Sequence, residues 1–510
     1  MKQKKSVYYF LIIAIALTLV LPILNLSFTY KYKSINTKSF TKKQLFSTDN
    51  LETIRNYIVY ITFNVSLNEE QVIAGEDNYL FLGNRYGNVI DKTQGNFSYT
   101  KEDISKWTDK LKNLQTWYEE KNIKFIMIIA PNKHSVYVDK LPDWIKINHL
   151  TITDAIVNAS KQKNINILDL RPILIENKNI KPLYMQTDTH WNNVGAALGY
   201  EATIDYIYRT FSIKLKKPFY TFKDKYKHPG DLADFLKISK FLPDKYDNVY
   251  TYSFNKKLYV CNGEIKKKNG NLKKCKKVLD PVMFINHKAQ YMINDKALNR
   301  EKLLFICDSF AGSGEGKVTH APLYNRTFQT IWKWHFMQLQ GARLSSFVTE
   351  HKPDLVIYQI TERDLYNSSI VSQLQGIVRN TGDQEIGEKI FNFKKNKYFK
   401  NDHFTILNDK IIVNKNDPII ILNNLKTTAE FVNVKIKLYS HKKTVFKIYY
   451  KNNLKDSYSE STSYRVLINK GKNDINLIIP GVYINNKLRI DIVKHKGKYT
   501  INDFSICKVL

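Results

Sequence analysis

Short apolar runs alternate with segments of helical spacing through most of the chain. The apolar runs are the length of strands that are buried on both faces of a sheet. The expected strands are 125–130, 165–170, 303–306 and 354–360. The expected helices, where apolar residues recur every three or four positions, are 104–118, 151–163 with Thr151 as candidate N-cap, 192–211 and about 332–350. This alternation predicts an α/β sheet with helices on both faces.

The pattern changes near residue 395. From there, short segments alternate apolar and polar residues and are separated by Asn, Gly and Lys. Such alternation is typical of strands with one buried and one solvated face. The clearest examples are 432–438, 444–450, 474–479 and 488–493. The sequence therefore predicts a separate antiparallel β-sandwich over residues 395–510.

The amino terminus predicts a membrane anchor. A basic head, Met1 to Lys5, precedes an apolar run from Val7 to Leu24, which is long enough for a helix to span the ~30 Å hydrocarbon core. A cleaved signal peptide is the alternative, but no persuasive small-residue cleavage site follows. The short basic head favours export of the remainder. The expected segments are an anchor at 1–30, a stalk at 31–72, the α/β domain at 73–394 and the sandwich at 395–510.

Charge sets limits on the partners. The net charge is +32, from 79 Lys and Arg against 47 Asp and Glu. The basic residues are spread along the whole chain, and no zinc-finger, helix-turn-helix or RNA-binding signature accompanies them. We therefore expect no nucleic-acid partner. A basic surface still suits an anionic glycan or lipid headgroups.

Cysteines and a glycine-rich loop give weaker signals. Cys261 and Cys275 flank a Lys/Asn/Gly-rich, hairpin-like stretch, and both a disulfide and two free thiols are open readings. Residues 311–317 follow a strand but lack two positions of a phosphate-binding loop, so a flexible lid is expected there. Neither the cysteines nor the histidines have the spacing of a zinc site, and we expect no metal and no cofactor.

Three polar residues supply the groups of a serine acyl-transfer site. Asp188 and His190 stand just before an expected helix, and Ser309 follows an expected strand. An acidic side chain orients an imidazole, the imidazole takes a proton, and the hydroxyl attacks a carbonyl. His190 and Ser309 are 119 residues apart, so only the fold can bring them together. Alone, each segment is an ordinary loop or turn, whereas the place of Ser309 after a strand suits the ligand-binding edge of an α/β sheet.

The chain resembles the alginate O-acetyltransferase family of polysaccharide-modifying proteins, whose catalytic domain is SGNH-hydrolase-like. The resemblance covers roughly residues 70–370, and the serine segment follows the Asp/His segment as in that family. The segments that carry it, in order, are Gly75–Leu82, Ala130–Lys133, Asp188–Trp191, Gly230–Ala233, Cys307–Phe310 and Pro353–Arg363.

The resemblance implies a role for each of the three residues. Ser309 is then the nucleophile, His190 the general base and Asp188 its partner, with the Ser309 backbone N–H as one oxyanion donor. Cys307 departs from the family pattern, because glycine usually precedes Asp-Ser. The resemblance also implies an extracytoplasmic polysaccharide as acceptor, a membrane-bound O-acyltransferase as acetyl donor, and a carbohydrate-binding role for the sandwich.

Two other functions fit the same residues. A glycan acetyl-esterase uses the same three groups, because water and a sugar hydroxyl are both acceptors of an acetyl group. A non-catalytic glycan-binding scaffold is the third reading. The presence of all three groups counts against the scaffold.

Overall fold

The computed structural model of the 510-residue chain describes most of it. The described segments are 2–32, 41–147, 150–227, 229–242, 245–252, 258–262, 275–278, 290–311, 321–336, 351–366, 386–396, 398–407, 410–423, 425–451, 463–485 and 487–509, with single positions 344, 347, 348, 374 and 458.

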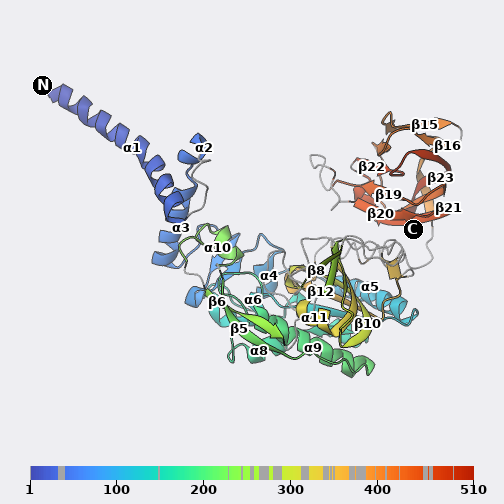
Figure 1. Ribbon diagram of the computed structural model, residues 1–510, viewed down its shortest axis with the longest axis horizontal. Helices are drawn as coiled ribbons and strands as arrows, with labels where there is room; N and C mark the ends of the chain where they lie inside the picture. Colours follow the sequence, from blue (N-terminus) through green and yellow to red (C-terminus); the bar gives the residue numbers. More distant parts are fainter. Residues whose placement is uncertain are drawn as a thin grey trace.

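An eight-stranded sheet forms the centre of the first large unit (Figure 1). Five strands are parallel, in the order β4 (Ile167–Asp169), β3 (Lys124–Ala130), β12 (Leu355–Thr361), β10 (Asn299–Cys307) and β11 (Phe328–His335). Three antiparallel strands extend it, namely β9 (Gln290–Ile293), β7 (Leu258–Asn262) and β8 (Cys275–Val278). The strand order does not follow the chain order, so residues far apart in sequence meet along one edge.

Successive residues of the central strands point to opposite faces of the sheet, and both faces are buried. In β10, Leu304 and Ile306 join one hydrophobic cluster, whereas Leu303 and Phe305 join the other. Burial of both faces explains why these strands have continuous apolar runs. The α/β fold with helices on both faces is confirmed.

Helices cover the two faces as expected. On one face lie α5 (Lys101–Glu119) and α7 (Ile152–Gln162), each of which begins with a capping box, at Thr100 with Asp103 and at Thr151 with Asp154. On the other face lie α8 (Arg171–Asn177), α9 (Asn193–Phe211) and α11 (Ala321–Thr327). The Asn192 side chain caps α9 by accepting from the N–H groups of Val194 and Gly195.

The helix expected around 332–350 is wrong in its first part. Trp332 to His335 belong to β11, which pairs with β10 in parallel and with β9 in the antiparallel sense. Trp332 and Trp334 pack on one face while Ile331 packs on the other. Trp332 and Trp334 are two positions apart, a spacing that suits one face of a strand and not one face of a helix, and the two neighbouring strands pair with them.

The amino-terminal segment contains three helices, α1 (Lys2–Tyr32), α2 (Lys42–Leu45) and α3 (Asp49–Phe63). Within α1, Val7–Phe28 is a stretch of 22 residues with a mean hydropathy of 2.6, long and apolar enough to cross a membrane. Figure 1 shows α1 extending away from the sheet. Near its end, the buried Asn25 amide donates to the carbonyls of Leu45 and Ser47, at 2.8 and 2.9 Å, which ties α1 to the segment that follows.

Two antiparallel sheets form the carboxyl-terminal region. Residues from both pack into one hydrophobic cluster, so a β-sandwich is present. It begins with β13 at Ile386, before the boundary expected at 395, because β13 pairs with β23. One sheet contains β13 (Ile386–Asn392), β15 (Phe404–Leu407), β16 (Lys410–Val413), β18 (Phe431–Ser440), β21 (Gly471–Pro480) and β23 (Gly497–Val509). The other contains β14 (Phe399–Lys400), β17 (Ile419–Leu422), β19 (Thr444–Tyr449), β20 (Ser463–Ile468) and β22 (Leu488–Asp491).

Shorter elements connect these units. They are β1 (Val72–Ala74), β2 (Leu80–Leu82), α4 (Val89–Gln94), α6 (Lys133–Val136), β5 (Tyr220–Lys227), α10 (Asp231–Phe235) and β6 (Lys245–Tyr252). The expected hairpin brings Cys261 opposite Cys275 in the β7–β8 register, but the side chains of both lie outside the described part. Most of the glycine-rich segment 311–317 also lies outside the described residues.

Candidate active site

Ser309 begins a single 3₁₀ turn, Ser309–Ala311, directly after β10 ends at Cys307. Strand β10 lies between β12 and β11, so Ser309 stands at the carboxyl edge of the parallel part of the sheet. Cys307, which replaces the usual glycine, is fully buried in the core on the α9 face. Burial raises the pKa of its thiol to about 12, so the thiol stays neutral.

The three side chains expected from the sequence lie in one chain of hydrogen bonds. His190 Nδ1 donates to Asp188 Oδ1 over 2.8 Å, and the Ser309 hydroxyl donates to His190 Nε2 over 3.0 Å. These directions follow from the network, because Asp188 accepts and therefore places the imidazole proton on Nδ1. Nε2 is then free to take the serine proton.

The environment of His190 favours its protonated form. Burial lowers the pKa of the imidazole, but the hydrogen bond and charge of Asp188 and the charge of Asp231 outweigh that effect, while Arg363 opposes them. The net pKa of His190 is raised above 6.5. A base of raised pKa is the stronger acceptor of the serine proton.

The two ends of the turn that carries Asp188 and His190 are hydrogen-bonded to each other. An isolated β-bridge joins Tyr184 to Trp191, and the Asn192 N–H donates to the Leu183 carbonyl at 2.8 Å. Within the turn, the His190 N–H also donates to Asp188 Oδ1, at 3.0 Å. The carboxylate of Asp188 is only 1% exposed, so its orientation is set by these bonds rather than by water.

Asp308 fixes the turn at Ser309 from the other side. Its carboxylate accepts from the Phe310 N–H at 2.9 Å and from both the N–H and the hydroxyl of Thr361. Thr361 is the last residue of β12, so the neighbouring strand holds the serine turn. Burial raises the pKa of Asp308, against the hydrogen bonds that lower it.

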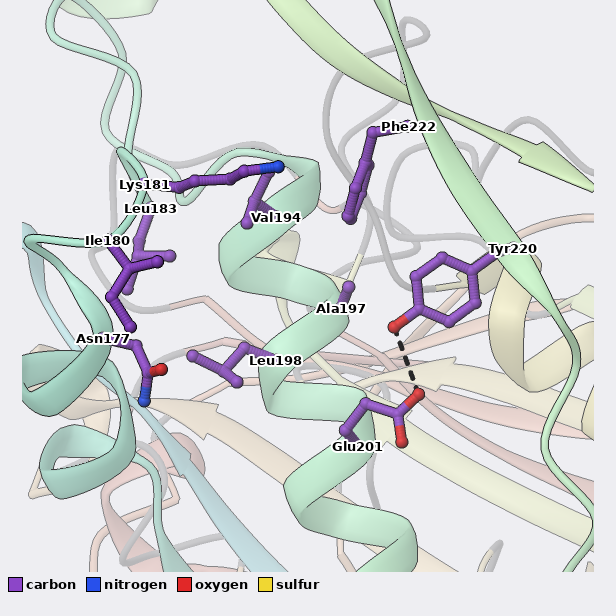
Figure 2. Close-up of a pocket in the computed structure, with 10 residues that line it drawn as sticks. All are labelled: Asn177, Ile180, Lys181, Leu183, Val194, Ala197, Leu198, Glu201, Tyr220 and Phe222. Atoms are coloured by element: carbon purple, nitrogen blue, oxygen red, sulfur yellow. Dashed lines mark hydrogen bonds between the residues drawn. The ribbon is translucent and has the colours of Figure 1, made fainter.

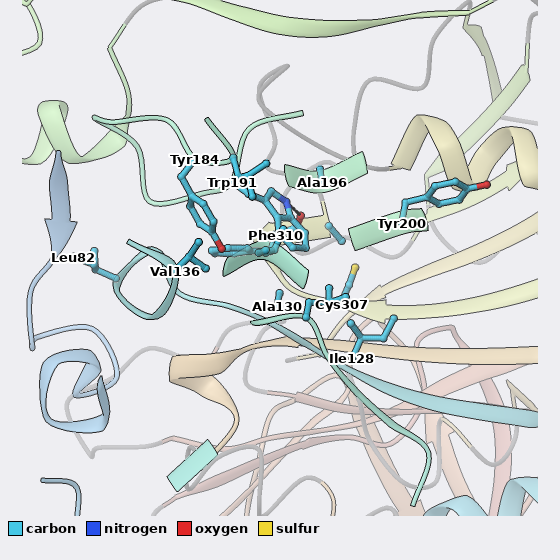
Figure 3. Packing of buried hydrophobic residues seen from close by; sticks show 14 of the residues in the cluster. Leu82, Ile128, Ala130, Val136, Tyr184, Trp191, Ala196, Tyr200, Cys307 and Phe310 are labelled. Atoms are coloured by element: carbon cyan, nitrogen blue, oxygen red, sulfur yellow. Dashed lines mark hydrogen bonds between the residues drawn. The ribbon is translucent and has the colours of Figure 1, made fainter. Parts of the chain in front are cut away.

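Trp191 joins the histidine turn to the serine turn. Its indole N–H donates to the Phe310 carbonyl at 2.9 Å, and the two rings pack edge to face at 5.4 Å (Figure 3). The His190 ring also contacts Phe310, at 5.0 Å. The Arg363 guanidinium lies 5.5 Å from the centre of the Phe310 ring and supplies a positive charge near the reacting groups.

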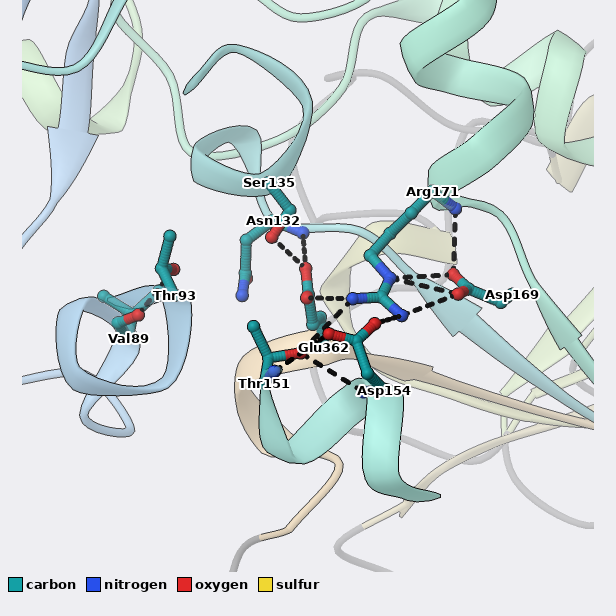
Figure 4. Close-up of polar contacts among 9 residues, drawn as sticks. All are labelled: Val89, Thr93, Asn132, Ser135, Thr151, Asp154, Asp169, Arg171 and Glu362. Carbon is teal, nitrogen blue, oxygen red and sulfur yellow. Dashed lines mark hydrogen bonds and ion pairs between the residues drawn. The ribbon is translucent and has the colours of Figure 1, made fainter. Parts of the chain in front are cut away.

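A buried ionic network supports the same edge of the sheet (Figure 4). Arg171 pairs with Asp169 and Asp154, both at 2.8 Å, and with Glu362 at 3.5 Å. Glu362 in turn accepts from the Asn132 N–H at 3.0 Å. The Asn132 side-chain oxygen accepts from Arg363 at 3.3 Å, so the network extends toward the turn that carries Ser309 and Phe310.

One further carboxylate lies near His190. Asp231, the first residue of α10, has Oδ2 3.8 Å from His190 Nδ1. Together with Asp188, these side chains offer three ligand atoms within 4.8 Å of one another, a grouping that a cation can occupy. Hydrogen bonds to His190 and Thr189 already occupy oxygens of both carboxylates. The absence of a metal stays a prediction.

An apolar pocket lies elsewhere than at these residues. It lies along the outer face of α9, has a volume of about 180 Å³ and is closed on one side by Tyr220 and Phe222 of β5 (Figure 2). The Tyr220 hydroxyl donates to Glu201 there at 3.1 Å. Since none of Asp188, His190 and Ser309 lines it, the pocket carries no argument about the reaction.

Sequence reasoning identified the three central residues but missed those that hold them. Asp231 stands inside the segment Gly230–Ala233, for which the sequence gives only a family resemblance. Thr361 and Glu362 follow an expected strand, and polar residues at that place are the signal that could have identified them.

Comparison with family models gives a match over part of the chain. Residues 72–258 match the family described as the SGNH hydrolase-like domain of the acetyltransferase AlgX. The range contains Asp188, His190 and Asp231, whereas Ser309 lies beyond it. The resemblance expected from the sequence is confirmed over this range. No curated protein matches the chain.

Several solved structures are similar in outline. Bacillus cereus PatB1 has 16% identity and a TM-score of 0.43, over 59% of this chain and 98% of its own. The O-acetyltransferase domain of Pseudomonas putida AlgJ has 15% identity and a TM-score of 0.36, over 60% and 98%. Pseudomonas aeruginosa AlgX has 13% identity and a TM-score of 0.41, over 88% and 96%.

Proposed function

We propose, on the premise that residues 72–258 carry the SGNH hydrolase-like domain of an acetyltransferase family, that this chain is a serine-dependent polysaccharide O-acetyltransferase. The observation that carries the proposal is the hydrogen-bonded series Asp188, His190 and Ser309 at the carboxyl edge of the sheet. This arrangement supports nucleophilic acyl transfer because each group has the partner that its step needs.

In the first half-reaction, the serine takes the acetyl group. His190 Nε2 removes the Ser309 proton as Oγ attacks the acetyl carbonyl of the donor. The resulting oxyanion collapses, and the leaving group of the donor departs with the proton from His190. Ser309 is then an acetyl ester, and the imidazole is neutral again.

In the second half-reaction, a sugar hydroxyl gives its proton to His190 and attacks the acetyl-serine. The carbon–oxygen bond to Ser309 breaks, and the serine oxygen recovers the proton from His190. The Ser309 N–H is proposed as one donor to the oxyanion in both halves. Asp188 stabilises the imidazolium throughout and is not itself protonated.

The apolar helix α1 supports a place for the reaction outside the cytoplasm. We propose that α1 is retained and that the α/β domain acts on the extracytoplasmic side. Helix α3 belongs to that domain rather than to a stalk, because its Tyr60 is buried in the domain core. Acetyl-CoA is absent from that side, so the acetyl donor is proposed to be a membrane-bound O-acyltransferase. Replacing α1 by a cleavable signal should keep activity on a soluble acetyl ester but abolish acetylation of the polymer in cells.

The carboxyl-terminal sandwich is proposed to bind the acceptor carbohydrate. It contains a largely polar pocket of about 380 Å³, suitable for sugar hydroxyls. The lining residues are Ile390, Phe391, Asn396, Leu422, Asn423, Leu425 and Lys426. In gels that contain the polysaccharide, the double variant Asn423→Ala, Lys426→Ala should be retarded less than the wild-type protein. Equal retardation of the two proteins would contradict this assignment.

The deciding experiment separates transferase from esterase. The full chain in detergent is given an acetyl ester, with and without deacetylated oligosaccharide, and both acetate and acetylated sugar are measured. With a transferase, adding the oligosaccharide should lower the amount of acetate released and produce acetylated sugar. Acetate release that the sugar does not change, with no acetylated product, would establish the esterase instead.

Serine variants test the mechanism. Ser309→Ala should lower the rate by about 10³-fold or more, because the nucleophile is lost. Ser105→Ala, an exposed serine of α5, is the matched control and should leave the rate unchanged. Equal activity of the two variants would exclude an acetyl-serine.

A further inference from the structure

His190 faces two carboxylates rather than one. Asp188 Oδ1 accepts the Nδ1 hydrogen bond at 2.8 Å, and Asp231 Oδ2 lies 3.8 Å from the same nitrogen. The two carboxylates come from different elements, because Asp188 lies in the turn before α9 and Asp231 begins α10. A Ser-His-Asp arrangement needs only one carboxylate, which is Asp188, and gives no role to Asp231.

Asp231 also holds the turn in which His190 lies. Its Oδ1 accepts from the Thr189 N–H at 2.7 Å and from the Thr189 hydroxyl at 3.1 Å. In the opposite direction, the Asp231 N–H donates to Asp188 Oδ2 at 3.2 Å. The start of α10 and the Asp188–His190 turn are therefore joined twice. The Asp231 side chain accepts from the turn, and the Asp188 side chain accepts from α10.

The backbone of Gly230 lies directly against that of Thr187, which holds Asp231 next to the Asp188–His190 turn. A Cβ built on Gly230 would lie 2.6 Å from the Thr187 carbonyl oxygen, so glycine lets the two backbones meet. The Gly230 N–H donates to the Thr187 hydroxyl at 3.0 Å, and the Leu232 N–H donates to the Thr187 carbonyl at 3.1 Å. Asp231 is thus fixed by bonds on both sides of it.

We propose that Asp231 is a positioning residue that acts through His190: it fixes the Asp188–His190 turn by hydrogen bonds and favours the imidazolium by its charge. This inference rests on the proposed acyl-transfer function and adds a residue to it. Asp188 then sets the tautomer, while Asp231 adds a second negative charge that is felt most when the imidazole is protonated.

The other charged groups around His190 determine the sign of the effect. Asp188 from its own turn and Asp231 from α10 favour the imidazolium, whereas Arg363 from the turn after β12 opposes it. The Ser309 hydroxyl faces Nε2 and is neutral. Burial and the charge of Asp188 raise the pKa of Asp231, and the imidazolium lowers it, so Asp231 and His190 stabilise each other's charged forms.

The test removes the charge but keeps the shape. In Asp231→Asn, the side-chain oxygen can still accept from the Thr189 N–H, but the negative charge is gone. The reaction of Ser309 with a fluorophosphonate probe, followed against pH in the full chain, reports the His190 base without any acceptor. We expect the acid limb to move to lower pH by about one unit, and the plateau rate to fall about tenfold.

Controls separate charge from structure. Asp234→Asn removes an exposed carboxylate from the same helix and should leave the pH profile at its wild-type position. Asp231→Ala removes both the charge and the Thr189 bonds and should be slower than Asp231→Asn. A purely structural role would lower the rate in both Asp231 variants while leaving the acid limb in place.

Three outcomes would overturn the inference. An acid limb in Asp231→Asn that coincides with that of wild type excludes the charge effect. Loss of probe reaction on treatment with a chelator, restored by Zn²⁺ or Mn²⁺, would assign Asp188, His190 and Asp231 to a metal. If wild-type Ser309 does not react with the probe at all, the proposed acyl-transfer function is wrong. The titration of the His190 imidazole by NMR then tests Asp231 separately. An imidazole pKa in Asp231→Asn equal to that of wild type excludes the proposed role of Asp231.

Discussion

Gly230 packs so closely against Asp188 that a Cβ added to the glycine would lie 2.3 Å from the Asp188 Cβ. The same atom would lie 2.6 Å from the Asp188 Cα, so the obstacle includes backbone and no side-chain rotation can relieve it. The φ angle of Gly230 is −80°, which any residue adopts, so only space demands glycine here. The two segments that bring carboxylates to His190 depend on this contact.

Gly230→Ala should therefore damage the site through packing alone. The added methyl must push the Asp188 turn away, with a loss of roughly 1–3 kcal/mol in the free energy of unfolding. Acyl transfer should fall by up to about 100-fold, because the His190–Ser309 distance changes. Chemical denaturation and the rate of acetyl-ester turnover are the measurements.

Gly199→Ala is the matched control for that change. The nearest atoms to a Cβ on Gly199 would belong to side chains, of Leu170 at 3.3 Å and Trp191 at 3.4 Å. Alanine also favours the α9 helix by up to about 1 kcal/mol. A Gly199→Ala variant as damaged as Gly230→Ala would contradict the assignment of a special contact to Gly230.

Trp191→Phe tests the link between the two halves of the site. Phenylalanine keeps an aromatic ring next to Phe310 but cannot donate to its carbonyl, which Trp191 reaches at 2.9 Å. We expect a loss of about 1–3 kcal/mol in stability from the unpaired buried carbonyl. We also expect a lower turnover rate, because the serine and histidine turns are then held together less firmly. A stable variant with the wild-type rate would show that the indole bond does not position the site.

The pH dependence follows from the raised pKa of His190. The general base must be neutral to accept the Ser309 proton, and its neutral fraction falls as the pH drops through the pKa. Because Asp188 and Asp231 together outweigh burial and raise this pKa above 6.5, the acid limb of kcat/KM should have its midpoint above pH 6.5. Hydrolysis of a chromogenic acetyl ester, measured from about pH 5 to about pH 9, gives the midpoint; one below 6.5 would contradict the expected environment.

The Arg171 network should be needed for stability. Arg171→Ala leaves Glu362 and Asp169 without their shared cation, and Glu362 is only 6% exposed. Removing one partner of a buried ion pair costs about 3–5 kcal/mol, here measured by chemical denaturation. Lys106→Ala breaks an exposed pair with Glu102 and should change stability little. Equal effects of the two variants would argue against a structural role for the network.

Local features of this protein were set by the sequence itself. Thr151 with Asp154 begins a helix where the sequence predicts one, because a capping box acts over three residues. Continuous apolar runs identify β3 and β10, because burial on both faces leaves no polar position. The types and order of Asp188, His190 and Ser309 were equally visible in the sequence.

Only the tertiary structure determined which distant residues contact one another. Trp332 to His335 pair with β10 on one side and β9 on the other, and only the fold brings these three strands together. The Ser309–His190 bond spans 119 residues, and it exists because the sheet places β10 between β12 and β11. Asp231 reaches the turn of Asp188 from 43 residues away, through a contact that Gly230 makes possible. Sequence patterns arise from forces that act over a few residues, whereas this site is made by backbones that only the fold brings together.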